Sequence, residues 1–394
     1  MTSVPVRFGD LGGITSGFAF SSAKFNEAGR GLPLIRCRDV NTAFAGVYYD
    51  GDFDPQFVVE NGDLLLSMDG DFKLLVWDNG RALLNQRVCR LEPNSKKIDK
   101  RFLLHFLPDK LNEIHAKTSF ATVKHLSAKT VREIEIPLPH KNGKPDLDEQ
   151  KRIAAILDKA DAIRRKRQRA LRLTDDFLRS VFLDMFGDPE ARGWSMTTVE
   201  GVAVDKKGSI RTGPFGSQLL HSEFVDSGIA VLGIDNAVTN QFAWGKPRFI
   251  SQEKYSELNR YTVHPGDVLI TIMGTCGRCA VVPDDIPTAI NTKHLCCITL
   301  DQSKCLPAFL HAYFLIHPLA RRYLAFHSKG AIMDGLNMGV IKGLPVPEAP
   351  IELQREFNSI VSKRSATVTR LTTQSDAADD LFTSLQQRAF RGEL

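Results

Sequence analysis

The chain repeats itself, and this duplication constrains its fold more than any other feature. Ile136-Pro-Leu-Pro139 is followed by Asp148-Glu-Gln-Lys-Arg-Ile153, and Leu344-Pro-Val-Pro347 is followed by Glu352-Leu-Gln-Arg-Glu-Phe357. The first residues of the two later motifs, Asp148 and Glu352, are 204 positions apart. A chain that repeats a domain and a long helix is expected to fold with pseudo-two-fold symmetry. It should then present two similar surfaces to whatever it binds.

The length of the chain agrees with such a division. At 394 residues it exceeds what one hydrophobic core usually supports, and 43% hydrophobic with 25% charged residues is ordinary for a globular protein. The repeat predicts four parts: a first variable domain (1–145), a first helical segment (146–189), a second variable domain (190–348) and a second helical segment (349–394). Turn-bounded apolar runs predict strands in the variable domains, and Phe309–Phe326 has helical spacing interrupted at Pro318.

The two helical segments carry a narrow apolar stripe at steps of three and four residues, which is typical of a coiled-coil seam. We therefore predict an α+β fold in which two mixed α/β domains are separated by two long antiparallel helices, each roughly 60 Å long at about 1.5 Å per residue. The predicted seam consists of Ile153, Leu157, Leu171, Leu178, Phe357, Val361, Leu371 and Phe382. Within the first segment, Arg164-Arg-Lys-Arg-Gln-Arg169 is a basic cluster. It suits DNA phosphates, an acidic partner or a solvated helix flank.

Composition and the first residues predict a cytoplasmic protein. No run of about 18 apolar residues suggests a membrane span, and the N-terminus does not look like a signal peptide. Seven cysteines without an export signal are expected to be reduced thiols. A net charge of +5 mildly favours a polyanionic partner.

No catalytic or metal-binding motif stands out. The chain has no Gly-x-x-x-x-Gly-Lys-Ser/Thr loop, no dinucleotide fingerprint and no methyltransferase catalytic turn. Pro145–Lys151 contains the acidic residues and lysine of nuclease sites, but within one helical turn their side chains cannot converge, so helix capping explains them better. Cys276-Gly-Arg-Cys279 with Cys296-Cys297 has a zinc-like spacing. Because adjacent cysteines on a strand point to opposite faces, we interpret them as buried apolar residues and expect no metal.

Polar and basic side chains in loops of both variable domains are candidates for DNA contact. Arg, Asn and Gln can bond the edges of guanine or adenine, and Lys can hold phosphates. The candidate DNA-binding residues are Arg36, Arg38, Lys124, Arg211, Ser217, Gln218, Arg278, Asn291, Lys293 and His294.

Taken together, these motifs resemble the specificity subunits of type I restriction-modification systems. The resemblance covers the whole chain and depends on the order variable–helix–variable–helix. It also depends on the proline-containing strand that precedes each long helix and on the sequence with which each helix begins. Three further motifs lie in the variable domains, namely Ser16-Gly-Phe-Ala-Phe20, Gly213-Pro-Phe-Gly-Ser217 and Gly266-Asp-Val-Leu-Ile270. Each motif is weak alone, but their order and duplication make the match specific.

The resemblance implies two target-recognition domains that read the halves of an asymmetric, interrupted double-stranded DNA sequence. It also implies helices that dock two DNA-methyltransferase subunits, with motor-nuclease restriction subunits joining for cleavage. The chain itself would then hold no cofactor and have no catalytic residues, and S-adenosylmethionine, ATP and magnesium would belong to its partners. Three alternatives remain: a nuclease or methyltransferase with an unrecognised site, a scaffold that binds no DNA, and a related defence system without a restriction motor.

Overall fold

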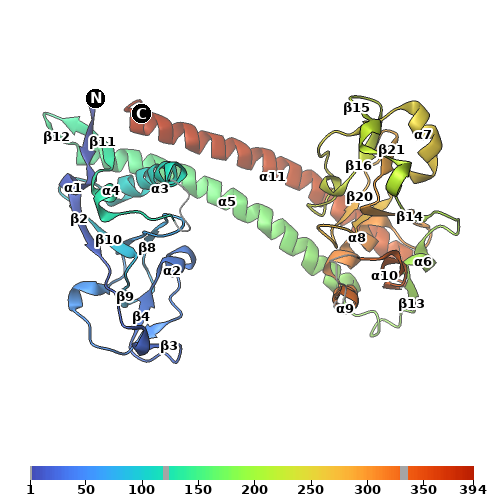
Figure 1. The fold of residues 1–394 in the computed structure, drawn as a ribbon, viewed down its shortest axis with the longest axis horizontal. Helices are drawn as coiled ribbons and strands as arrows, with labels where there is room; N and C mark the ends of the chain where they lie inside the picture. The colour runs from blue at the N-terminus through green and yellow to red at the C-terminus, as the bar shows by residue number, and fades with distance from the viewer. Residues whose placement is uncertain (1, 119–123, 329–335) are drawn as a thin grey trace. The chain divides into compact units, whose positions relative to one another are not determined.

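The computed structural model describes residues 2–118, 124–328 and 336–394. The chain divides into two compact units, one formed by Met1–Gln168 with Thr373–Leu394 and the other by Arg169–Thr372. Each unit therefore contains one variable domain together with a part of each long helix (Figure 1). The predicted combination of mixed α/β domains with long helices is confirmed.

In the described residues of the first unit the strands form three sheets. They are the antiparallel pair β1–β11, extended by β12 (Lys144–Pro145), a four-stranded sheet β2–β10–β7–β8 and a five-stranded sheet β3–β5–β4–β9–β6. In the last sheet β4 and β9 run parallel, whereas the other pairings are antiparallel. The strands are β1 (Thr2–Arg7), β2 (Gly12–Ser16), β3 (Phe25–Asn26), β4 (Leu32–Ile35), β5 (Tyr48–Tyr49), β6 (Val58–Val59), β7 (Leu64–Ser67), β8 (Leu74–Val76), β9 (Ala82–Leu84), β10 (Val88–Pro93) and β11 (Glu135–Lys141).

The second unit repeats this strand order. It pairs β13 with β23, and it forms the sheets β14–β22–β19–β20 and β15–β17–β16–β21–β18, with β16 and β21 parallel. Its strands are β13 (Met196–Thr198), β14 (Ile210–Thr212), β15 (Phe224–Val225), β16 (Ile229–Leu232), β17 (Phe249–Ile250), β18 (Thr262–Val263), β19 (Val268–Thr271), β20 (Cys279–Val281), β21 (Ala289–Asn291), β22 (Leu295–Ile298) and β23 (Pro345–Pro347). The same order in both units confirms the duplication inferred from the sequence.

The strands form where apolar runs are buried on both faces. All four residues of β7 and all four of β22 are buried, as the continuous apolar character of these strands predicts. Helix α3 (Lys100–Lys117) covers the first core with Phe102, Leu103 and Leu107. In the second unit α8 (Pro307–Ile316) is followed by α9 (Pro318–Ser328), so the predicted break at Pro318 is confirmed.

The long helices are α5 (Leu147–Phe186) and α11 (Ile351–Arg391), which lie within the helical segments expected from the repeat. At the start of α5 the Asp146 carboxylate accepts a hydrogen bond from the Glu149 N–H at 3.1 Å, which is the N-terminal bond of the expected cap. In the first unit Arg164 contacts Asp379 and Arg167 contacts the Gln374 carbonyl. Because one residue number rises as the other falls, the two helix segments run antiparallel within this unit.

Two equivalent glutamines join the long helices to their domains. The buried Gln150 side chain accepts from the Asp99 N–H at 2.8 Å and donates to the Lys97 carbonyl at 3.3 Å. Gln354, 204 positions later, accepts from the Leu306 N–H at 2.8 Å and donates to the Lys304 and Ala349 carbonyls. Asp99 and Leu306 are the N-caps of α3 and α8. Each long helix is thus tied to the same place in its domain.

Candidate nucleic-acid interface

In each domain the two parallel strands end at the same edge of the sheet. The first edge comprises residues 36–39, which follow β4, and residues 85–87, which follow β9. The second edge comprises residues 233–236, which follow β16, and residues 292–294, which follow β21. Loops at the carboxyl ends of parallel strands are a frequent place for ligand binding, because the buried strands hold them in position.

The first edge is rich in cations. Arg36 lies on the Asp39 carboxylate, with Nε–Oδ2 at 2.9 Å and Nη2–Oδ1 at 3.3 Å. Arg38 and Arg87 are exposed, and Arg87 forms an ion pair with Asp69 at 3.4 Å. The Cys37 thiol donates a hydrogen bond to the Arg87 carbonyl at 2.7 Å, which joins the two loops of the edge.

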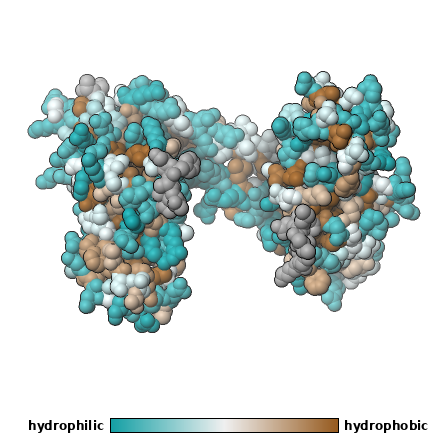
Figure 2. Space-filling view, in the orientation of Figure 1, coloured by the Kyte–Doolittle hydropathy of each residue, from teal (hydrophilic) through white to brown (hydrophobic). Residues whose placement is uncertain are grey.

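Aromatic side chains adjoin the first edge. Phe18 is 50% exposed, and its ring centroid lies 5.2 Å from those of Phe20 and Phe57. The Gln86 N–H donates to the Phe18 carbonyl at 2.8 Å, which places this aromatic group beside the cations. Figure 2 shows apolar surface in the region of β3, β4 and β9.

The second edge carries Lys293 and His294, both half-buried. Burial lowers the pKa of His294, and the charges of Lys293 and Arg248 lower it further. Arg248 belongs to this cluster because its Nη2 donates to Asp235 Oδ1 at 2.5 Å. The Ile272 N–H donates to the His294 carbonyl at 2.9 Å, so the turn between β19 and β20, which contains Arg278, lies next to this edge.

Most of the predicted DNA-binding residues lie at or near the two edges. Arg36 and Arg38 are at the first edge, and Lys293 and His294 are at the second. Lys124 lies near the first edge, because its carbonyl accepts from the Gly70 N–H at 3.0 Å and Gly70 follows Asp69, the partner of Arg87. The remaining candidates that are exposed are Ser217, Gln218 and Arg278.

Two candidates are corrected by the structure. The Arg211 side chain is only 9% exposed and forms an ion pair at 2.8 Å with Asp267, which is 1% exposed. Asn291 is fully buried and donates to the Leu295 carbonyl at 3.0 Å. Because both side chains are engaged inside the domain, we expect them to support its fold and not to contact DNA.

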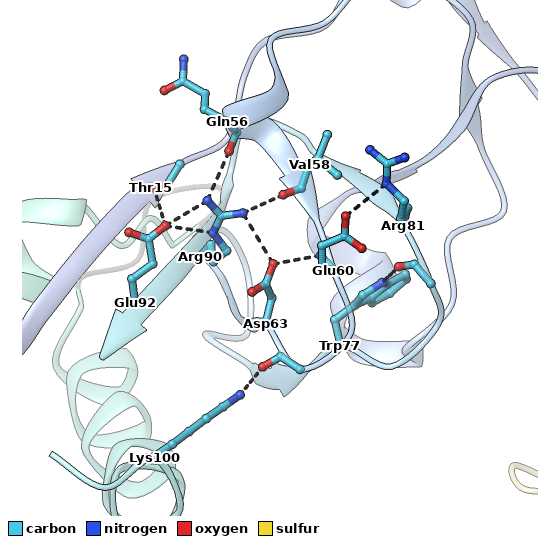
Figure 3. A network of polar contacts seen from close by, with 12 residues as sticks. Thr15, Gln56, Val58, Glu60, Asp63, Trp77, Arg81, Arg90, Glu92 and Lys100 are labelled. Carbon is cyan, nitrogen blue, oxygen red and sulfur yellow. Dashed lines mark hydrogen bonds and ion pairs between the residues drawn. The ribbon is translucent and has the colours of Figure 1, made fainter. Parts of the chain in front are cut away.

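The first domain forms the equivalent of the Arg211 ion pair from a different strand. Asp63 occupies the position of Asp267, since Gly62-Asp-Leu matches Gly266-Asp-Val. Its partner is Arg90, whose Nη1 lies 3.5 Å from Asp63 Oδ2 and donates to the Val58 carbonyl at 2.6 Å (Figure 3). Arg90 on β10 pairs across the sheet with Thr15 on β2, and Arg211 on β14 pairs with Cys297 on β22. The arginine that pairs with this aspartate therefore lies on β10 in the first domain and on β14 in the second. Strand β14 corresponds to β2, the strand that pairs with β10.

Six of the eight predicted seam residues belong to or pack against the core of their own unit. Ile153, Leu157 and Phe382 belong to the first core, and Phe357 belongs to the second, against which Leu178 and Val361 pack. Leu171 and Leu371 are half-buried. Arginines occupy the gap in the stripe, where Arg164 pairs with Asp161 and lies 4.6 Å over the Phe382 ring. Side chains buried in a core are not accessible to a partner, so we expect a partner to meet other side chains of these helices.

The exposed helix surface instead carries isolated apolar residues. Phe177 on α5 is 57% exposed and Leu381 on α11 is 55% exposed. The two positions are 204 residues apart and are therefore equivalent in the repeat. Leu173, one turn before Phe177, is 54% exposed. The sequence pattern missed these residues because they lie outside the seam period.

Five of the seven cysteines are buried in the hydrophobic cores, namely Cys89, Cys279, Cys296, Cys297 and Cys305. Burial raises the pKa of Cys296 to about 12 and raises the pKa values of Cys279 and Cys297 as well. Within residues 2–118, 124–328 and 336–394, no group of three or more His, Cys, Asp or Glu side chains is arranged to hold a metal ion. None of the helices in these ranges is long and apolar enough to cross a membrane.

Comparison with known proteins agrees across sequence and fold. Residues 2–173 match the type I restriction modification DNA specificity domain. The chain is 32% identical over 422 aligned positions to the type I restriction enzyme EcoBI specificity subunit of Escherichia coli, covering 99% of this chain and 85% of that protein. It is 22% identical to the MjaVIII specificity subunit of Methanocaldococcus jannaschii over 55% of this chain and 51% of the other.

Two solved structures share the fold. A type I restriction-modification S subunit from M. genitalium superposes with a TM-score of 0.60 at 14% identity, covering 99% of this chain and 96% of that one. A chain from a structural study of type I restriction-modification complex assembly gives a TM-score of 0.53 at 17% identity, covering 100% of this chain and 98% of the other.

Proposed function

Because the chain belongs to the family of type I restriction-modification specificity subunits, we propose that its two domains read the two parts of a bipartite double-stranded DNA target. The chain is the DNA-recognition component of such a system and not its catalyst. The first edge reads one part and the second edge reads the other. A partner methyltransferase supplies S-adenosylmethionine, and a motor-nuclease subunit supplies the ATP- and magnesium-dependent steps.

One observation carries the proposal of an asymmetric target. The two edges occupy the same place on the same strand arrangement, but their side chains differ. The first edge has Gln86 and Arg87, whereas the second has Lys293 and His294 at the corresponding places. Two domains with the same strand arrangement but different hydrogen-bond donors and acceptors are expected to bind different base sequences, because each base pair is distinguished by the donors and acceptors on its edge.

A domain exchange tests this proposal. Residues 190–348 would be replaced by the second variable domain of another family member, and methylated sites would be mapped in the host genome. We expect one block of the target to change and the other to remain. Both blocks changing together, or a continuous palindromic target, would falsify the two-domain interpretation.

We propose further that two methyltransferase subunits dock on the long helices at equivalent places centred on Phe177 and Leu381. Half-exposed apolar side chains on a polar helix are typical of partner surfaces. Their equivalence in the repeat supports two copies of one partner, since each copy would meet a similar surface. Leu173 extends the first of these surfaces.

The docking proposal is tested with Phe177→Asp and Leu381→Asp, singly and together. Each single change should remove one methyltransferase subunit from the purified complex, and the double change should remove both. Gln168→Asp and Thr372→Asp are matched controls, because both are exposed, are 204 residues apart and lie nine residues before the test positions, on the opposite helix face. Full assembly of the Phe177→Asp/Leu381→Asp protein would place the docking surface elsewhere.

A further inference from the structure

In each domain one guanidinium group lies beside the same turn of the edge, although the two arginines come from different parts of the chain. In both domains the first residue after the parallel strand donates its N–H to a side chain three positions later. The Arg36 N–H bonds Asp39 Oδ2 at 2.9 Å, and the Gly233 N–H bonds Asn236 Oδ1 at 2.8 Å. These shared bonds show that position 36 corresponds to position 233, and position 39 to position 236.

In the first domain the guanidinium belongs to the turn residue itself, Arg36, and lies on Asp39. In the second domain the turn residue is Gly233, and Arg248 reaches the same place from the segment before β17. A Cβ added to Gly233 would lie 2.6 Å from Arg248 Nη2 and 2.9 Å from its Cζ. The Arg248 guanidinium thus fills the space that a side chain at position 233 would occupy. It bonds Asp235 at 2.5 Å and the Val231 carbonyl at 3.3 Å.

Both groups are held in position but remain open to a ligand. The side chains of Arg36 and Arg248 are 21% and 28% exposed, in contrast with 9% for the structural Arg211. The hydrogen bonds of Arg36 and Arg248 to neighbouring residues come from Nε and Nη2. Within the described part of the chain, no hydrogen bond uses Nη1 of either arginine. An arginine has five N–H donors, so each of these side chains retains donors that can face outward.

The surroundings of the two groups also match. The exposed Arg38 and Arg87 adjoin Arg36, and Lys293 and His294 adjoin Arg248. A solvent-exposed aromatic side chain follows on the same loop in each domain, Phe44 at 66% and Trp244 at 59% exposure. The loops are fixed alike, since the Phe44 N–H donates to the Asp39 carbonyl and the Ala243 N–H donates to the Asn236 carbonyl.

We infer that Arg36 and Arg248 are equivalent DNA-backbone anchors, which bind a phosphate of the target duplex in each half-site regardless of base sequence. This inference rests on the proposed function of the two domains. The side chains around the two edges have diverged, whereas the guanidinium has kept its place even though the residue that carries it has changed. A contact common to two domains that read different sequences is expected to be with the phosphate backbone, which all sequences share.

The test measures how the assembled complex of this chain with its methyltransferase subunits binds two duplexes, one containing the mapped target and one unrelated, over a range of salt concentrations. Arg36→Met and Arg248→Met should each weaken binding to both duplexes by the same factor, roughly tenfold. Each should also reduce the slope of log affinity against log salt by about 0.9, the value for one released phosphate contact. Arg36→Lys and Arg248→Lys keep the charge and should retain the wild-type slope.

Arg81→Met is the matched control, because Arg81 is an exposed arginine that precedes β9 and so lies at the opposite end of that strand. It should leave affinity and slope unchanged. An unchanged slope in the Arg36→Met and Arg248→Met complexes, a reduced slope in the lysine variants, or a loss confined to the target duplex would overturn the inference. If the wild-type complex binds neither duplex, the proposed function itself fails, which is a separate outcome.

Discussion

At the scale of single residues, the domains keep their ionic contacts while the residues that provide them change. Asp63 and Asp267 occupy equivalent positions, and each pairs with one arginine. The two arginines, Arg90 and Arg211, occupy positions that face each other across two paired strands, so each domain uses a different one of the two positions. A buried carboxylate without a partner is costly, so loss of one arginine must be compensated from a neighbouring position. The cross-strand neighbour is the nearest such position.

This exchange predicts a rescue. Arg211→Thr should lower the free energy of unfolding of the second unit by about 3 kcal/mol, because it removes the guanidinium that balances the buried Asp267 charge. His264, Cys297 and Thr299 still donate hydrogen bonds to this carboxylate, but none of these bonds comes from an arginine or lysine. Adding Cys297→Arg reproduces the Thr15–Arg90 arrangement of the first domain and should recover a large part of the loss. Denaturant unfolding of the full chain provides the measurement. A double variant as unstable as the single one would show that the two arrangements are not interchangeable.

A buried histidine, His317, and a half-buried one, His311, predict an acid-sensitive second unit. His317 is 1% exposed, and its Nε2 contacts the Phe186 carbonyl while Nδ1 accepts from the Leu319 N–H at 3.1 Å. Protonation of Nδ1 would break the latter bond. Burial lowers the pKa of both His317 and His311 below the usual value of 6.5.

The direction of this pH effect follows from proton binding. Below about pH 6.5 the unfolded chain binds protons at these histidines that the folded chain does not, so stability falls as the pH falls. The thermal midpoint of the second unit should therefore drop between about pH 7.5 and about pH 5.5. His317→Gln should show a smaller drop over the same interval, since one of the two groups no longer titrates. Equal drops in both proteins would remove His317 from the explanation.

At the scale of elements, the junction between each long helix and its domain depends on one buried amide. Gln354 satisfies the Leu306 N–H and two carbonyls, and Gln150 performs the same task in the first unit. Gln354→Ala should reduce stability by about 2 kcal/mol, because several buried backbone groups lose their partner at once. Arg355→Ala is the control, because Arg355 is the next residue on the same helix and is exposed, and it should change stability little. Hydrogen exchange at the start of α8 would locate the damage.

At the scale of the whole molecule, the helical segments are expected to set the length of the unspecified gap in the target. Two domains reading one face of B-DNA should have centres about one helical turn apart, roughly 10 bp. Matched seven-residue insertions in α5 and α11 preserve the helical period on both segments and lengthen each by about 10 Å. The gap should then lengthen by no more than about 3 bp, the number that about 10 Å spans at about 3.4 Å per base pair, because the second domain must also turn to follow the groove. Both defined blocks should be unchanged. Methylation mapping reads out both quantities, and an unchanged gap would contradict the spacer role.

The sequence by itself determined the duplication, the presence of the two long helices and the family. Repeated motifs and apolar periods are local in the chain, and Gln150 and Gln354 already stand at equal places in it. Only the tertiary structure decided which arginines lie at the two edges. Arg211 proved to be buried and Arg248 proved to stand at the second edge, although neither position is marked by a local pattern. The physical reason is that a long side chain can reach a carboxylate from several strands, and the pairing of those strands is set by the fold.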